Sequence, residues 1–459
     1  MNYNLLTYEV ERRLAGARFK VVPISAFEVM LQYGCSERAT DEQVGTPILR
    51  MNNLQAEGWD LRNIKYIALD DDELSRWRLE RGDIVFNRTN SKELVGKCEV
   101  FEEDGEWVFA SYLMRLRVDR KQVEPEFLAA FLNAQTGRIQ IDRESRQIIG
   151  MSNINAQEIR TLRVPLPKPR QQQEMLRILA AGRAARKKKL AEAEALLVGL
   201  DDFLLDSLGI SLPIEVYPTV FAVRTTDVRR LKKLYPAFFH PERINVIRAV
   251  ESRYPGKHSA ALSAIADFVR DQRIVDAADE YLGLANVQPC TGERIDSTEE
   301  DGKGNCFEYR KDDVLFARLR PYLNKVYRAE ANGICSTEFH VIRIHKDAHG
   351  RPIILPDYLG SVLRSRIVLA QTRHMMTGNT HPRLANEDVV NLVVPIPDIE
   401  VQQDIAGEVV RRREKARSLR DDAQFLWENA KRKFEEELFG AGSNVERVQK
   451  TANTKGGRK

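Results

Sequence analysis

Two long stretches of the chain share one pattern of apolar and polar positions. Leucine and alanine recur at spacings of three and four residues from Leu190 to Leu208, and a second series runs from Ala416 to Leu438. Such spacing forms an apolar stripe along a helix and is typical of a coiled-coil seam. We therefore predict two helices of about 35 residues, each roughly 50 Å long. The predicted seam consists of Leu190, Ala193, Leu197, Leu200, Leu204, Leu419, Ala423, Leu426, Ala430 and Phe434.

Each predicted helix follows the same kind of segment. The sequences VPLPKPRQQQEM, from Val164, and VPIPDIEVQQDI, from Val394, both predict a short apolar strand that ends in Pro-x-Pro, followed by a glutamine-rich turn. Proline lacks an N–H and restricts the residue before it, so the helix begins only after this turn. Gly209 and Gly440 stand where the helices are expected to end. The two segments are 230 residues apart, which indicates an internal duplication.

The region before each helix is repeated as well. Residues 82–88 and 312–318 both predict a turn into a buried strand with polar residues at its end. Residues 125–136 and 356–365 both predict an amphipathic helix that begins with proline. A polar loop is predicted from Gln147 to Asn155. We predict an α+β fold in which two mixed α/β domains alternate with the two long helices, and the loops that differ between the copies are candidates for function.

Composition indicates an ordinary soluble protein. The 459 residues are 43% hydrophobic and 30% charged, and no run of about 18 apolar residues could span a membrane. The N-terminal sequence carries charges where a signal peptide needs an apolar core. The five cysteines are scattered and odd in number, which favours reduced thiols in a cytoplasmic protein over disulfides or a zinc site.

The net charge of +4 is small, but basic residues cluster at equivalent places in the two helices. The clusters are 183–189 and 411–417. Two interpretations remain open, because clustered lysine and arginine can neutralise nucleic-acid phosphates or can form a solvated helix face.

We find no motif that predicts catalysis. The sequence contains no GxGxxG after a strand, no GxxxxGK[ST], no [DN]PP[YF], no GxSxG and no HExxH. His345 and His349 are four residues apart but fall in an expected loop, so we predict no metal site. We predict that this chain alone is not an enzyme.

Polar residues in the predicted loops are of the types that contact DNA. Arginine bonds guanine, asparagine and glutamine bond adenine, and lysine bonds phosphate. Asn153 and Asn155 could instead cap the helix that begins near Ala156. The candidates in the first half are Arg50, Asn52, Asn53, Asn87, Arg88, Asn90, Lys92, Arg146, Asn153 and Asn155. Those in the second half are Asn286, Gln288, Arg318, Arg320, Tyr322, Asn324, Lys325, His374, Asn379, His381 and Arg383.

Several motifs together suggest a family. They are PILRMNNL from Pro47, RGDIVFNRTNS from Arg81, and GMSNINAQEIRTLRVPLPKPRQQQEM from Gly150 with its second copy from Gly378. With these motifs and the long helices, residues 21–440 resemble the specificity (S) subunit of a Type I restriction–modification system. Asp312 departs from the pattern because the first copy has glycine, Gly82, at this position.

The resemblance implies two target-recognition domains that each read half of a bipartite DNA site through the major groove. The helices would pair as an antiparallel coiled coil about an internal pseudo-twofold, set the spacing of the half-sites and dock two methyltransferase subunits, and a restriction–translocase subunit could join. S-adenosylmethionine, ATP and magnesium would belong to those partners, and phage defence would be the role. The implied segments are a lead-in (1–20), recognition domain 1 (21–168), spacer helix 1 (169–209), a connector with recognition domain 2 (210–398), spacer helix 2 (399–440) and a disordered basic tail (441–459).

Two other classes of protein remain as alternatives. One is a stand-alone restriction or methylation enzyme with fused recognition domains, which would show activity without other subunits. The other is a helical scaffold that never touches DNA, which would show no salt-dependent DNA binding.

Overall fold

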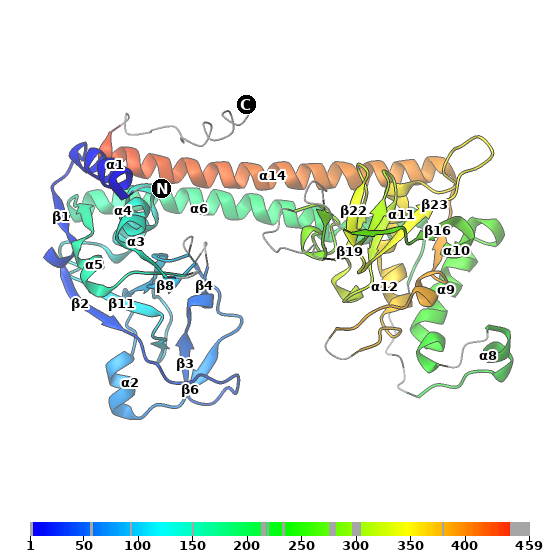
Figure 1. Cartoon of the computed structure of the whole chain (residues 1–459), viewed down its shortest axis with the longest axis horizontal. Helices are drawn as coiled ribbons and strands as arrows, with labels where there is room; N and C mark the ends of the chain where they lie inside the picture. Colours follow the sequence, from blue (N-terminus) through cyan, green and yellow to red (C-terminus); the bar gives the residue numbers. More distant parts are fainter. Residues whose placement is uncertain are drawn as a thin grey trace. The chain divides into compact units, whose positions relative to one another are not determined.

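A computed structural model describes residues 3–55, 58–91, 94–148, 151–212, 217, 220–231, 235–274, 281–295, 304–378 and 381–440. Its contacts divide the chain into two units: unit 1 is Met1–Lys188 with Asp422–Lys459, and unit 2 is Lys189–Asp421. Each unit holds one mixed domain and part of both long helices (Figure 1). The predicted boundaries divide the chain at the helix ends instead, and they stay a prediction. The predicted disordered tail lies outside the described residues.

Unit 1 contains the first mixed domain, called domain 1. Its helices are α1 (Tyr3–Ala15), α2 (Asp71–Trp77), α3 (Pro125–Asn133), α4 (Gln135–Glu144), α5 (Ala156–Thr161) and the first part of α6 (Pro169–Val198), with 3₁₀ helices η1 (Ile24–Ala26) and η2 (Met51–Asn53). Its strands are β1 (Val21–Pro23), β2 (Glu28–Tyr33), β3 (Thr46–Leu49), β4 (Leu54–Gln55), β5 (Gly58–Trp59), β6 (Lys65–Ile67), β7 (Ile84–Asn87), β8 (Thr89–Asn90), β9 (Cys98–Val100), β10 (Val108–Phe109), β11 (Leu113–Val118), β12 (Arg146–Ile148), β13 (Met151–Asn153) and β14 (Arg163–Pro165).

Unit 2 contains the second mixed domain, called domain 2. Its helices are α7 (Leu200–Leu208), α8 (Thr225–Leu231), α9 (Pro241–Arg253), α10 (Leu262–Ile265), α11 (Pro356–Arg364), α12 (Arg366–Thr372), α13 (Asn386–Val389) and most of α14 (Ile399–Phe439), with η3 (Pro236–Phe239), η4 (Gly256–His258), η5 (Leu284–Asn286) and η6 (Pro321–Leu323). Its strands are β15 (Ser259–Ala261), β16 (Ala266–Val269), β17 (Gln272–Ile274), β18 (Tyr281–Leu282), β19 (Asn305–Tyr309), β20 (Val314–Ala317), β21 (Val326–Arg328), β22 (Gly333–Ser336), β23 (Phe339–Ile344) and β24 (Val393–Pro395).

The two domains have matching sheets. A four-stranded antiparallel sheet has the order β2-β11-β7-β9 in domain 1 and β16-β23-β20-β21 in domain 2. A second sheet in each domain includes one parallel pair, β3 with β10 and β18 with β22. The strand of each Pro-x-Pro segment pairs with an early strand of its own domain, β14 with β1 and β24 with β15. The α+β fold and its internal repeat, predicted from the sequence, are therefore confirmed.

A buried ion pair fixes the start of the central strand in each domain. Both Asp83 oxygens accept from Arg117, at 2.7 and 2.8 Å, and both Asp313 oxygens accept from Arg343, at 3.0 and 2.7 Å. The carboxylate side chains are almost fully buried, and their hydrogen bonds raise the pKa of the two arginines. At Asp312, where the first copy has glycine, the backbone keeps a positive φ of 73°, so the turn has the same left-handed form.

Buried glutamines explain the polar residues of the duplicated turn. Gln172 accepts from the Glu124 N–H at 2.8 Å and donates to the Pro167 carbonyl at 2.8 Å. Gln402 makes the equivalent bonds to the Leu355 N–H and to the Pro397 carbonyl. A second equivalent pair, Gln140 and Gln371, bonds the backbone of Arg163 and Val393. Each amide satisfies backbone groups that the proline turn leaves without partners.

The long helices contact each other in both units. In unit 1 the nearest atom to a side chain built on Gly182 would be the Ala430 Cβ, and in unit 2 a small cluster joins Ala193 to Ala416 and Leu419. Within unit 2, Ala193 meets Ala416 and Leu419, and the later residue Gly199 bonds the earlier residue Arg412, so the two helices run antiparallel there. This agrees with the predicted seam.

Other seam residues have a different neighbour. Leu204 packs in the core of domain 2, and Ala430 and Phe434 pack in the core of domain 1. The stripe therefore also buries each helix end against a domain. Leu197 lies partly buried beside the helix cluster, Ala423 is fully buried, and Leu190, Leu200 and Leu426 are half-buried.

Two predicted elements differ from the structure. The first long helix is interrupted at Gly199, because glycine is a poor helix former and its carbonyl accepts from Arg412 at 3.4 Å. The expected loop at 147–155 contains strands β12 and β13, which pair antiparallel from Arg146 with Asn153. In the described part of the chain, every helix is too short or too polar to cross a membrane.

Candidate nucleic-acid interface

A pair of backbone hydrogen bonds fixes Arg88 at the end of β7. The Arg88 N–H donates to the Tyr112 carbonyl at 3.0 Å, and its carbonyl accepts from the Ile154 N–H at 3.0 Å. These bonds place Tyr112 and Asn153 beside it. Tyr33, the last residue of β2, lies with its ring 4.7 Å from the guanidinium carbon. Tyr33, Arg88, Tyr112 and Asn153 are called frame 1.

The same backbone bonds recur in domain 2. The Arg318 N–H donates to the Glu338 carbonyl at 2.8 Å, and its carbonyl accepts from the Leu384 N–H at 2.9 Å. Glu338 therefore takes the place of Tyr112, and Arg383 takes the place of Asn153. Arg270, the residue after β16, takes the place of Tyr33, because the strand register puts it opposite His340 as Tyr33 is opposite Met114. Arg270, Arg318, Glu338 and Arg383 are called frame 2.

The side chains of frame 1 leave the arginine without a carboxylate. Arg88 donates to the Ser111 carbonyl and to Asn153 Oδ1, both at 3.4 Å, and Asn153 in turn donates to Thr89 at 3.0 Å. Among the described residues, the buried Arg88 Nε has no hydrogen-bond partner. The Tyr33 ring that lies against this cation is 40% exposed, and Tyr112, whose carbonyl bonds the Arg88 N–H, is 50% exposed.

Frame 2 contains a carboxylate, that of Glu338. Glu338 accepts from Arg383 at 2.8 Å and lies 3.9 Å from Arg318. The hydrogen bonds to Glu338 raise the pKa of Arg383. Behind them, burial and then the charge of Arg318 lower the pKa of His340 to about 4. The two frames therefore present different chemistry on one backbone pattern.

Some predicted DNA-contact residues have structural roles. Asn53 and Asn286 accept from the Arg50 and Gly283 N–H groups and close the same 3₁₀ turn in both domains. Asn155 caps α5 by accepting from the Glu158 N–H, which was the alternative considered for it. Further internal bonds hold Arg50 to the Asn63 carbonyl, Asn324 to the Arg364 carbonyl, Lys325 to the Leu284 carbonyl and Gln288 to Thr291.

The other predicted contact residues range from buried to exposed. Asn87 is buried with no hydrogen-bond partner for Oδ1 among the described residues, and Asn90 is half-buried. Those on the surface are Asn52, Arg320, Tyr322 and His381. Arg146 lies on β12, and Lys92 and Asn379 fall outside the described residues. All of these assignments stay predictions. Sequence reasoning missed Tyr33, Tyr112, Arg270 and Glu338, although aligning the β11 and β23 sequences would have paired Tyr112 with Glu338.

The second basic block is bound inside unit 2. Arg411 and Arg412 both pair with Glu408, and Arg412 also lies over the Phe203 ring at 4.6 Å. Arg417 and the nearby Arg420 pair with Glu293, which is buried. These contacts favour a role in fixing α14 to domain 2.

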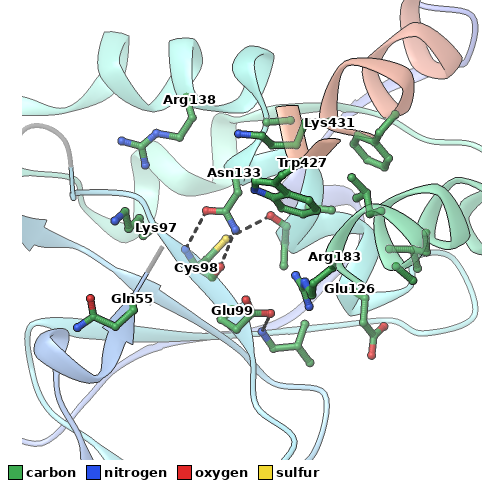
Figure 2. A pocket seen from close by; sticks show the side chains of 18 of the residues that line it. Gln55, Lys97, Cys98, Glu99, Glu126, Asn133, Arg138, Arg183, Trp427 and Lys431 are labelled. Carbon is green, nitrogen blue, oxygen red and sulfur yellow. Dashed lines mark hydrogen bonds between the residues drawn. The ribbon is translucent and has the colours of Figure 1, made fainter. Parts of the chain in front are cut away.

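A cavity of about 480 Å³ lies in unit 1 between β9, α3 and the long helices. Figure 2 shows Trp427 and Lys431 of α14 facing Cys98 and Asn133 across it. Asn133 donates to the Cys98 carbonyl at 2.6 Å and accepts from its N–H at 3.3 Å. Burial raises the pKa of the Cys98 thiol far above its usual range, so this thiol is not a nucleophile at neutral pH.

Unit 2 has an equivalent cavity of about 470 Å³. The positions of Gln55, Trp427 and Phe434 in the first cavity are taken by Gln288, Leu197 and Leu204 in the second. The cavities thus belong to the duplicated scaffold, and their linings differ as the frames do.

The side chain of His374 is held within domain 2 by two contacts. Its Nε2 lies 2.7 Å from Glu242, and its ring stacks 3.5 Å from the ring of His240. The ligand atoms of these three residues lie within 4.8 Å of one another, a spacing that sequence could not reveal because His240 and His374 are far apart in the chain. The His240 Nδ1 already caps α9, however, and the lone pairs of nearly parallel rings do not converge on one ion. The group joins the start of α9 to the segment that follows α12.

Comparisons with known proteins find similarity to one kind of domain. Residues 34–195 match the model of the Type I restriction modification DNA specificity domain. The chain is 28% identical over 162 residues to the Type I restriction enzyme EcoKI specificity subunit of Escherichia coli, with 35% of each chain covered. It is 24% identical over 153 residues to the putative type I restriction enzyme MjaX specificity subunit of Methanocaldococcus jannaschii, with 33% of this chain and 36% of the relative covered. The match thus spans about a third of each relative.

Solved structures were compared as well. An S subunit of a Type I restriction–modification system from M. genitalium has a TM-score of 0.41 at 13% identity, with 92% of this chain and 96% of that chain covered. A chain from a study of complex assembly in the type I R-M system has a TM-score of 0.47 at 14% identity, with the same coverage. The resemblance seen in the sequence is confirmed by the family model and the curated relatives: residues 34–195 match the Type I restriction modification DNA specificity domain, and about a third of the chain is similar to Type I specificity subunits.

Proposed function

We propose that this chain is the non-catalytic, sequence-specific DNA-recognition subunit of a Type I restriction–modification complex. The observation that carries the proposal is the pair of frames. One backbone pattern, with the same hydrogen bonds and the same strand order, presents Tyr, Arg, Tyr and Asn in domain 1 and Arg, Arg, Glu and Arg in domain 2. Proteins that read different sequences with one scaffold vary the side chains at fixed positions.

Each domain reads one half of a bipartite duplex site in this proposal. The side-chain types in the frames support it, because arginine and asparagine bond base edges and tyrosine packs against sugar or base. Replacing residues 21–160 by another recognition domain tests it. The expected result is one changed half-site in a methylation map, and loss of both half-sites would contradict independent reading.

The long helices set the distance between half-sites. A helix of 41 residues, as in α14, extends about 60 Å, which is comparable with one to two turns of DNA. Inserting or deleting one helical turn within 185–205, with a matching change in α14, should alter the number of unread base pairs and leave the bases of each half-site unchanged. An unaltered spacing would count against this role.

Methyltransferase subunits dock on the helices, and a restriction subunit can join them. S-adenosylmethionine, ATP and magnesium act in those partners. Phe425 on α14 supports docking, because it is a large aromatic side chain that is 67% exposed in unit 1. Phe425→Ala should weaken co-purification with a methyltransferase subunit, whereas the neighbouring Gln424→Ala should not.

One experiment tests the whole proposal. The chain is co-expressed with a methyltransferase subunit, the complex is purified, and adenine methylation is mapped across the host genome. The expected result is one bipartite motif that disappears without this chain. Methylation or cleavage by the isolated chain would instead support the stand-alone enzyme.

A further inference from the structure

The arginines of the two frames differ in how their charge is balanced. Arg88 makes no ion pair with a described residue, and both of its side-chain hydrogen bonds are 3.4 Å long. Arg318, at the same place in domain 2, lies beside Glu338, which also binds Arg383. An arginine that is partly buried without strong acceptors favours a ligand that supplies them.

The position of Arg88 is fixed although its bonds are weak. The ring of Tyr33 lies under the guanidinium, Asn153 lies at one edge, and the backbone is bonded on both sides. Asn153 is itself held by Thr89 at 3.0 Å, so the edge that it presents to the arginine is fixed. A guanidinium held in one plane loses little side-chain entropy when it binds.

The surroundings of Arg88 suit a planar group with two acceptors. The exposed ring of Tyr33 lies against one face of the guanidinium, and the long hydrogen bonds leave its outer nitrogens available to a stronger acceptor pair. Guanine offers N7 and O6 side by side in the major groove, and their spacing matches the fork of an arginine. A phosphate also matches the fork of an arginine, but it carries no base identity, so the replacement of single bases distinguishes the two ligands.

We infer that Arg88 reads a guanine in the half-site of domain 1, and that Arg318 is not an equivalent guanine reader because the carboxylate of Glu338, 3.9 Å from it, balances its charge. This inference rests on the proposed function and names the base that one frame recognises. It assigns a specificity-determining role to Tyr33 and Asn153 as positioning residues of Arg88.

The test uses the full chain in complex with its methyltransferase subunits. Methylation is mapped first for the wild type, and binding is then measured on a duplex that carries the resulting motif. Each guanine in turn is replaced by 7-deazaguanine, which lacks the N7 acceptor. One guanine in one half-site should be sensitive in the wild type, with a loss of affinity of about 5- to 150-fold.

Three substitutions complete the test. Arg88→Gln should bind the natural motif about 5- to 150-fold more weakly and should be insensitive to 7-deazaguanine at that one position. Arg88→Lys keeps the charge but not the fork, so it should also lose the guanine preference. Arg318→Gln is the matched control and should leave the preference for every guanine of the motif unchanged. Thermal unfolding of each variant checks that the fold is kept.

The outcomes distinguish failure of this inference from failure of the proposed function on which it rests. If the wild-type complex methylates no specific motif, the proposed function fails and this inference with it. If the wild type has a motif and Arg88→Gln keeps the same motif and the same 7-deazaguanine sensitivity, the function stands and the role of Arg88 is overturned. Loss of a guanine in Arg318→Gln would overturn the asserted difference between the frames.

Discussion

The arginine of frame 1 lies against an aromatic ring, whereas the arginine of frame 2 lies near a carboxylate. In domain 1 the guanidinium of Arg88 contacts Tyr33 and Asn153, and in domain 2 Glu338 lies 3.9 Å from Arg318 and bonds Arg383. The backbone bonds around both arginines are the same. The comparison shows that in a duplicated scaffold the hydrogen bonds of the main chain can stay constant while the charge at one site changes completely. Stability and specificity thus rest on different residues.

The largest expected effect tests whether the two scaffolds are equivalent. Asp83→Ala and Asp313→Ala each remove the buried partner of an arginine, Arg117 or Arg343. Breaking one side of a buried pair costs about 3–5 kcal/mol, so hydrogen exchange should show this loss in the domain that carries the change. Asp104→Ala is the control, because its side chain is 92% exposed. A large effect in only one domain would show that the scaffolds are not equivalent.

A smaller effect tests whether the frames set specificity. Transferring frame 1 into domain 2 requires Arg270→Tyr, Glu338→Tyr and Arg383→Asn, which leave Arg318 in the setting of Arg88. We expect the second half-site to gain a guanine preference of about 1–3 kcal/mol, measured by methylation mapping and by binding. The first half-site should not change. An unchanged second half-site would place its specificity outside frame 2.

A pH experiment tests one further difference between the domains, the histidine His340 that lies next to frame 2. His340 has a pKa of about 4 when folded and about 6.5 when unfolded. Because the unfolded chain binds more protons below pH 6.5, the stability of domain 2 should fall by about 2 kcal/mol from pH 7 to pH 5. His340→Met installs Met114, the residue at the same place in domain 1, and should flatten this dependence in denaturant unfolding. An equal slope in the variant would assign the effect to another group.

The smallest effect concerns one helix cap. Asn155 caps α5, whereas Ala385 stands at the cap of the equivalent α13 without a side-chain bond. Asn155→Ala should cost about 1 kcal/mol, and Ala385→Asn should recover up to about that amount in domain 2. Asn155→Ser should keep the stability, since serine also caps. If Asn155→Ser changes the methylated motif, the residue reads DNA as well.

The sequence predicted the elements better than the site. Periodicity and the proline turns gave the helices, the central strands and the duplication, because these depend on local patterns and on a constant spacing. The frames depend on long-range neighbours: Tyr33 and Asn153 meet Arg88 only because β2, β7 and β13 come together. The break at Gly199 was missed because one glycine does not disturb the apolar stripe. Asn53 and Asn286 were taken for DNA contacts because their turn-closing bonds leave no signal in a single sequence.

The ends of the two long helices have a consequence for the order of the chain. At the end of α14 the Leu438 carbonyl accepts from the Arg18 N–H at 2.9 Å, next to the start of domain 1. At the end of α7 the Leu208 carbonyl accepts from the Tyr254 hydroxyl at 2.9 Å, next to the start of domain 2. Each helix therefore ends beside the start of a domain: α7 ends beside the start of domain 2, and α14, the last helix, ends beside the start of domain 1. A permuted chain in which residue 440 is joined to residue 3, with new ends after Leu212, should therefore retain every contact described within units 1 and 2.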